Sequence, residues 1–208
     1  MKKKAEHDGG PNRLLGHTAL LVIDVQKGFD EPRWGRRNNP HAEANIARLL
    51  AAWRKRKAPV IFVQHDSTVP GSPLAPGGPG WAIKEEVSPL PGEAVVHKQV
   101  HSAFIGTQLE LLLRRREIQG LVLAGLTTDH CVSTTARMAA NLGFSTFVIA
   151  DATACFERLG QDSTRYAAEE VHRVSLASLH GEFVTVLDTE QALSLLGASE
   201  AESGEADA

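Results

Sequence analysis

Continuous apolar runs alternate with helical patterns along this chain, and the alternation limits the folds that it can adopt. Ala19 to Ile23 is one such run, as expected for a strand that is covered on both faces. Apolar residues at helical spacing follow it at Ile46, Leu49, Leu50 and Trp53. Repetition of this pattern predicts an α/β protein, a three-layer αβα sandwich around a six-stranded parallel sheet.

Local sequence signals give the expected ends of the elements. The six strands are expected at residues 19–23, 60–63, 93–96, 121–124, 146–149 and 183–186. Thr107 and Glu110 have the spacing of a capping box before one helix. Ser163 is expected to cap a helix that ends near Gly181, and Asp188 is expected to cap a last short helix.

The chain of 208 residues has the length of one domain with a sizeable core. This domain is expected at residues 17–197. Residues 1–16 are charged and contain glycine and proline, so we expect a flexible N-terminal arm. Residues 198–208 are acidic and lack large apolar groups, which predicts a disordered acidic tail.

Charge and cysteine content restrict the partners and the compartment. The net charge of −3 does not indicate a nucleic-acid surface. No apolar run approaches the length of a membrane span, and the first basic residues are followed by polar ones rather than by the apolar core of a signal peptide. Two cysteines do not make a disulfide framework. We therefore expect a cytoplasmic protein with neither nucleic-acid nor membrane partners.

Three residues able to do chemistry follow predicted strands. Asp24 closes the first strand, Lys98 follows the third, and Cys131 follows the fourth in the first turn of a helix that should end near Leu142. Ligands of parallel α/β sheets bind beyond the carboxyl ends of the strands, where these side chains should meet. The N–H groups of the helix start would favour a Cys131 thiolate and could hold an oxyanion.

A thiol, a carboxylate and an ammonium can together carry out acyl transfer. Cys131 would be the nucleophile, and Asp24 would accept its proton and later donate a proton to the leaving nitrogen. Lys98 would keep Asp24 ionised and stabilise the thiolate, because nearby opposite charges favour both anions.

Several stretches of the chain resemble the isochorismatase-like cysteine hydrolases, a superfamily that includes nicotinamidases, N-carbamoylsarcosine amidases and ureidoacrylate amidohydrolases. The resemblance covers roughly residues 17 to 195 and implies a Rossmann-like sheet. The stretches that carry it are residues 21–26, Lys98 with 102–109, 125–132, and 151–154.

The resemblance also implies the functional residues and the assembly. It implies a catalytic triad of Asp24, Lys98 and Cys131. It implies a non-proline cis peptide between Leu126 and Thr127, which would aim the Thr127 N–H, together with the Cys131 N–H, at the oxyanion. A homo-oligomer, either a dimer or a tetramer, is implied as well.

One departure from the nicotinamidase pattern bears on metals. Nicotinamidases carry an Asp-x-His segment and a further His that bind a metal, whereas this chain has Val63 in place of the Asp, keeps His65, and has no second His from Ser67 to Val96. One imidazole is a poor zinc site, because such sites usually have three protein ligands. We therefore expect no metal and no other cofactor.

The resulting hypothesis is a metal-independent cysteine hydrolase that cleaves a C–N bond of a small amide, ureide or lactam through a thioester. An isochorismatase proper, which cleaves a vinyl ether, is one alternative. A non-enzymatic binding or redox module with a reactive Cys131 thiol is the other. Release of ammonia or an amine would separate the hypothesis from the first alternative, and thiol oxidation without turnover would favour the second.

Loops near the predicted triad supply the candidates for the substrate pocket. The long segment 66–92 is rich in proline and glycine and has no clear element, so we expect a lid or a binding loop there. Trp34 and Trp81 lie in such loops without an evident core face, which also suits a subunit interface. The candidates for contact with the small-molecule substrate are Phe29, Trp34, His65, Trp81, His101, Phe104 and His130.

Overall fold

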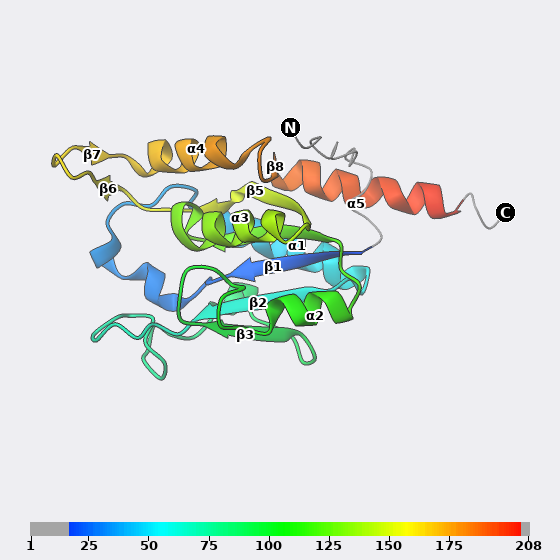
Figure 1. Ribbon diagram of the computed structural model, residues 1–208, viewed down its shortest axis with the longest axis horizontal. Helices are drawn as coiled ribbons and strands as arrows, with labels where there is room; N and C mark the ends of the chain where they lie inside the picture. Colours follow the sequence, from blue (N-terminus) through cyan, green and yellow to red (C-terminus); the bar gives the residue numbers. More distant parts are fainter. Residues whose placement is uncertain (1–16, 205–208) are drawn as a thin grey trace, which may run out of the picture.

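The computed structural model describes residues 17–204, so the predicted N-terminal arm at 1–16 lies outside the described residues. Six parallel strands form one sheet in the order β3-β2-β1-β4-β5-β8, which confirms the predicted sheet (Figure 1). The strands are β1 Thr18–Ile23, β2 Val60–His65, β3 Ala94–Lys98, β4 Gly120–Leu126, β5 Ser145–Ala154 and β8 Thr185–Leu187.

Helices cover both faces of the sheet, as the alternating pattern predicts (Figure 1). One face packs against α1 (Ala42–Lys55) and α5 (Thr189–Gly204), and the other against α2 (Leu109–Arg115), α3 (Ser133–Asn141) and α4 (Ala168–Leu179). Helix α5 thus extends into the segment 198–208 that the sequence predicts as a disordered tail, and residues 205–208 lie outside the described part.

Strand β1 shows why the apolar runs are continuous. All six of its residues are buried, and Leu21 and Ile23 join the core under α2 and α3. Leu20 and Val22 point to the opposite core, under α1 and α5. Because successive side chains of a strand face opposite sides, a strand between two helical layers needs apolar residues at every position.

Two predicted helix starts are wrong, while a third is confirmed. Helix α2 begins at Leu109, so Thr107 accepts a hydrogen bond from the Leu109 N–H, and Glu110 pairs with Arg114 instead of closing a capping box. Asp188 does cap α5: its Oδ1 accepts a hydrogen bond from the Gln191 N–H at 2.7 Å.

Ser163 lies in a hairpin turn rather than at a helix start. Strands β6 (Arg158–Leu159) and β7 (Arg165–Tyr166) form a two-stranded antiparallel ribbon, and α4 begins only at Ala168. The Asp162 carboxylate accepts hydrogen bonds from the N–H and hydroxyl of Thr164. Such side-chain contacts to the local backbone favour a turn over a helix, which is the physical reason for the error.

Gly125 is required where β4 runs beside β1. Its φ is +127°, and a Cβ atom added there would lie 2.0 Å from the Ile23 carbonyl oxygen. The atoms that this Cβ would meet belong to the Ile23 backbone, in strand β1, so they cannot move aside as the end of a flexible side chain could.

We therefore expect Gly125→Ala to lower the free energy of unfolding by on the order of 3 kcal/mol or more, measured by denaturant titration. Gly143→Ala is the matched control, because Gly143 also has a positive φ, of +87°, but a Cβ there meets no atom within 4 Å. The control should lose only about 1 kcal/mol. Equal losses would mean that backbone conformation, and not collision, sets the cost.

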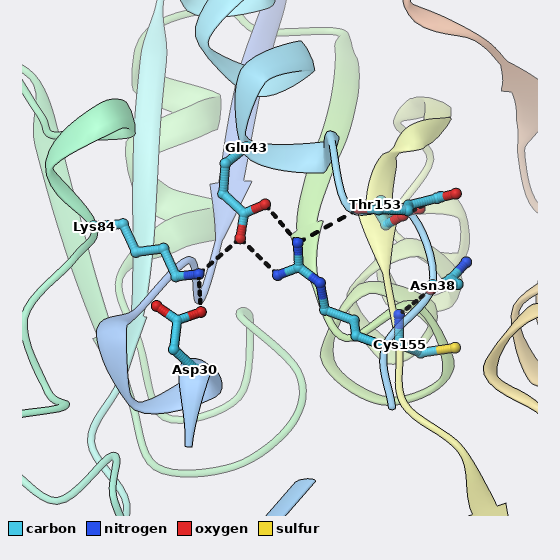
Figure 2. A network of polar contacts seen from close by, with 8 residues as sticks. Asp30, Asn38, Glu43, Lys84, Thr153 and Cys155 are labelled. Carbon is cyan, nitrogen blue, oxygen red and sulfur yellow. Dashed lines mark hydrogen bonds and ion pairs between the residues drawn. The ribbon is translucent and has the colours of Figure 1, made fainter. Parts of the chain in front are cut away.

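A network of charged side chains fixes the loops beside the sheet (Figure 2). Glu43, at the start of α1, accepts two hydrogen bonds from Arg37 at 2.6 and 2.7 Å and one from Lys84 at 2.8 Å. Lys84 also pairs with Asp30. Although burial opposes the charge of Glu43, these cations lower the pKa of its carboxyl to about 2.

The lowered pKa of Glu43 predicts how stability depends on pH. The folded state favours the ionised form of Glu43 more than the unfolded state does. Glu43 therefore stabilises the fold fully above the ordinary glutamate pKa, and this contribution is lost as the pH falls toward about 2. Glu43→Gln should therefore cost about 2–3 kcal/mol of unfolding free energy at neutral pH, and progressively less below pH about 4.

Glu85→Gln is the control for this titration, because Glu85 makes an exposed ion pair with Lys27. It should change stability little at any pH. A Glu43→Gln cost that stays constant down to the acid limit would contradict an electrostatic origin.

Candidate active site

The cluster that the sequence predicts lies at the switch point of the sheet. Strands β1 and β4 are neighbours, and chain connections leave them in opposite directions along the sheet. Asp24 directly follows β1, and Cys131 lies in a π-helical turn, Thr128–Val132, that follows β4 and leads into α3. Crevices at such points are where open α/β sheets bind ligands.

Lys98 reaches this crevice from two strands away. It is the last residue of β3, and β2 separates β3 from β1. Its Nζ lies 2.6 Å from Asp24 Oδ2, 3.3 Å from Cys131 Sγ and 3.2 Å from Nδ1 of His65, the last residue of β2. An ammonium has three N–H donors, so these three neighbours can accept all of them.

The cluster of Asp24, Lys98 and Cys131 is almost closed to solvent. Asp24 is 0% exposed, Lys98 2% and Cys131 7%. Asp24 Oδ2 is engaged by Lys98, whereas Asp24 Oδ1 is buried with no hydrogen-bond partner among residues 17–204. A buried carboxylate oxygen normally has a partner. Oδ1 is therefore the Asp24 atom that is free to receive a proton.

Burial sets the protonation states of the two acidic groups. It raises the pKa of Asp24, and the charge of Lys98 only partly opposes this. Burial and the charge of Asp24 also raise the pKa of the Cys131 thiol, more than Lys98 lowers it. These shifts oppose the thiolate that the sequence-based argument expects at a helix start, because the thiol is buried beside a carboxylate.

His65 is a neutral acceptor in this cluster. Burial and the neighbouring Lys98 charge lower its pKa to about 4. A neutral imidazole can accept a hydrogen bond from the Lys98 ammonium through Nδ1, whereas a protonated one would repel it. His65 thus helps to hold Lys98 between Asp24 and Cys131.

Backbone geometry on both sides of the crevice is unusual. The Leu126–Thr127 peptide is cis, as the resemblance implies, and Asp24 has a φ of +52°. The next residue of the turn, Thr128, is held from α4, since its hydroxyl lies 2.9 Å from Nδ1 of the buried His172. These contacts fix the turn from which the Cys131 sulfur projects.

A cavity of about 310 Å³ opens onto Asp24 and Cys131. Of the seven predicted pocket residues, Phe29, Trp34, His65, His101 and His130 line it. His101 comes closest to the sulfur, with Nδ1 3.6 Å from Cys131 Sγ, and its ring lies 5.4 Å from that of His130.

The structure places Trp81 and Phe104 elsewhere. Trp81 stacks on His97 and donates a hydrogen bond from Nε1 to Asp66, and Phe104 packs on Phe144 at the edge of the core. Trp34 also has partners within the chain, because it stacks with Phe29 and Phe156. Neither tryptophan therefore gives the separate support for a subunit interface that its loop position suggested.

The segment 66–92, expected to be a lid or a binding loop, does supply part of the cavity wall, through residues 67 and 69–74. Sequence reasoning named none of these residues individually, and it missed a further one. Arg158, at the start of the hairpin, also lines the cavity. The signal for Arg158 in the sequence was weak. It lies between the predicted strand 146–149 and the helix start predicted at Ser163, where a charged residue is ordinary.

In the described chain, no group of three or more His, Cys, Asp and Glu side chains is arranged to hold a metal ion. Likewise, none of the helices within residues 17–204 is long and apolar enough to cross a membrane.

The fold and the Asp24–Lys98–Cys131 cluster together define a class, the α/β cysteine hydrolases. The chain belongs to the isochorismatase family, whose domain matches residues 18–191. The isochorismatase family protein YrdC of Bacillus subtilis is 51% identical over 173 residues, which are 83% of this chain and 92% of that protein.

Two further relatives cover most of the chain. An isochorismatase-family crystal structure from Chromobacterium violaceum has a TM-score of 0.85 and 47% identity, over 88% of this chain and 94% of that one. Ureidoacrylate amidohydrolase RutB of Pseudomonas savastanoi pv. phaseolicola is 31% identical, over 77% of this chain and 83% of that protein.

Proposed function

We propose that this protein is a metal-independent cysteine hydrolase that cleaves a C–N bond of a small amide, ureide or lactam through a thioester. The observation that carries the proposal is the position of the Lys98 ammonium, 2.6 Å from the Asp24 carboxylate and 3.3 Å from the Cys131 sulfur. A relative named as an amidohydrolase adds support for C–N chemistry.

Acylation would begin with transfer of the thiol proton to Asp24 Oδ1. The sulfur attacks the carbonyl carbon, and the N–H groups of Thr127 and Cys131 would hold the resulting oxyanion. Asp24 then gives its proton to the leaving nitrogen, the C–N bond breaks, and a thioester remains. The raised pKa of Asp24 suits this role, because a base with a higher pKa accepts a proton more readily.

Deacylation would use the same groups, with water as the nucleophile and the Cys131 sulfur as the leaving group. Asp24 takes a proton from water as the water attacks the thioester, and the C–S bond breaks to release the acid. The leaving thiolate regains its proton from Asp24, and Lys98 stabilises the sulfur while it is charged. The contact of His65 with Lys98 supports a mechanism without metal, because that imidazole already serves the triad.

Release of ammonia or an amine from a panel of amides, ureides and lactams tests the proposal. Ammonia release that depends on Cys131 is the expected result. Turnover of a vinyl ether without C–N cleavage would favour an isochorismatase proper. Thiol oxidation with no turnover of any substrate would favour a reactive-thiol module.

A further inference from the structure

Arg158 lines the cavity with most of its hydrogen-bonding capacity unused. Its Nε donates to Asp129 Oδ2 at 2.7 Å. Within the part of the chain that the structure describes, its two terminal nitrogens, Nη1 and Nη2, have no hydrogen-bond partner. The side chain is about one-third exposed and lines the same cavity as Cys131. A guanidinium anchored on one edge therefore presents its open fork to this space.

The other cations in or beside the cavity, Arg33 and Lys98, are already engaged. Lys98 is paired with Asp24 and contacts Cys131. Arg33 pairs with Glu31 at 2.8 Å and donates to the Gly71 carbonyl at 3.1 Å. A second anion in the cavity would thus find its partner at Arg158, whose planar fork can donate two parallel hydrogen bonds to a carboxylate.

Asp129, which holds Arg158 Nε, is itself largely buried. Asp129 is the third residue of the nucleophile segment 127–131, and its side chain is only 10% exposed. The pair therefore joins the hairpin strand β6 to the turn that carries Cys131. Because the guanidinium is already fixed, less side-chain entropy is lost when it binds a ligand.

Part of the cavity wall is apolar. Phe29, Trp34 and Leu74 line it, and Phe29 and Trp34 belong to one aromatic cluster with ring centroids 5.3 Å apart. A small ligand can thus place an apolar body against these rings while its two polar ends face Cys131 and Arg158.

We infer that Arg158 is a specificity-determining residue that binds a carboxylate, so that the substrates are small amides or ureides whose apolar body bears a carboxylate remote from the scissile bond. This assignment deepens the proposed function and rests on it, because the amide end of the ligand is set against Cys131.

Matched ligands that differ only in charge test the assignment. In a Cys131→Ala background, which removes turnover, isothermal titration would compare 4-carbamoylbenzoate with terephthalamide, and glutaramate with glutaramide. At least one carboxylate should bind about 10- to 100-fold more tightly than its carboxamide counterpart, the range expected for hydrogen bonds to a charged group.

Three variants in that background assign the preference to its residue. Arg158→Gln should abolish the carboxylate preference, and Arg158→Lys should keep only part of it, because an ammonium lacks the fork. Arg165→Gln is the matched control: Arg165 lies in the same hairpin but pairs with Glu157 at the surface, so the preference should remain. If Arg158→Gln does not fold, the lysine variant decides.

The inference is overturned if each carboxylate binds no better than its carboxamide, or if the preference survives loss of the Arg158 fork. Ammonia release by the unmodified protein is measured separately. Cys131-dependent amide hydrolysis without a carboxylate preference would remove only the role of Arg158. Carboxylate binding through Arg158 without hydrolysis of any amide would remove only the proposed function.

Discussion

Cys131→Ala should reduce turnover of any amide substrate by roughly 10⁴-fold or more, because no other group of the cluster can form the thioester. The fold should remain, since the sulfur borders an existing cavity and the truncated side chain leaves no new enclosed void. Steady-state ammonia release gives the activity, and thermal unfolding followed by circular dichroism gives the stability.

Cys155→Ala is the matched control for this variant. Cys155 is 0% exposed, and its thiol donates a hydrogen bond to the Ala168 carbonyl away from the cavity. Its replacement should lower stability but leave turnover largely intact. Retention of a large part of the activity by Cys131→Ala would exclude covalent catalysis by this residue.

The two thiols should also differ in alkylation by iodoacetamide. Cys131 should react first because it borders the cavity, whereas Cys155 is enclosed. Both should react more slowly than a free thiol at neutral pH, since burial raises the pKa of each, that of Cys155 to about 12. Faster reaction of Cys131 than of a free thiol would show that Lys98 outweighs burial.

The sheet was predictable because the pattern that specifies it is local. Each buried parallel strand needs an unbroken apolar run, and the six runs are separated by polar turns and helices. The strand ends then place Asp24, Lys98 and Cys131 at one edge, so their meeting follows from topology. The helix starts at Thr107 and Ser163 were harder, because the same residue types also favour turns.

The cavity depends on contacts that sequence spacing does not specify. Trp81 reads like a loop aromatic free to meet a ligand, but its indole N–H is bound by Asp66 and its ring by His97. Arg158 reads like a surface charge, yet Asp129, 29 residues earlier in the chain, holds it at the cavity. Burial of the thiol, which decides its protonation, likewise depends on the packing of several loops.

Asp24→Asn should slow acylation by roughly 10²–10⁴-fold, the usual contribution of a positioned general base. The amide has nearly the shape of the carboxylate, but it cannot receive the thiol proton at the oxygen that is now free. Since the thiol pKa is raised by burial, little thiolate forms without a base. Single-turnover kinetics would isolate this step from deacylation.

The variant also removes the charge partner of a buried lysine, and this effect must be separated from loss of the base. An unpaired buried charge costs about 3–5 kcal/mol of stability, so Asp24→Asn should unfold at a lower temperature. The double variant Asp24→Asn/Lys98→Met removes both charges and should regain much of that stability. It should not regain the rate, because the proton acceptor is still missing.

His101→Asn is the control for the identity of the base, because the His101 imidazole is the other proton acceptor near the sulfur, at 3.6 Å. Asp24 faces the thiol from a closed site, whereas His101 is exposed to solvent and has no fixed contact with Lys98 in the described structure. We therefore expect His101→Asn to lower the acylation rate by less than about tenfold. The reverse order, with a large loss for His101→Asn and a small one for Asp24→Asn, would make His101 the base and leave Asp24 as the residue that positions Lys98.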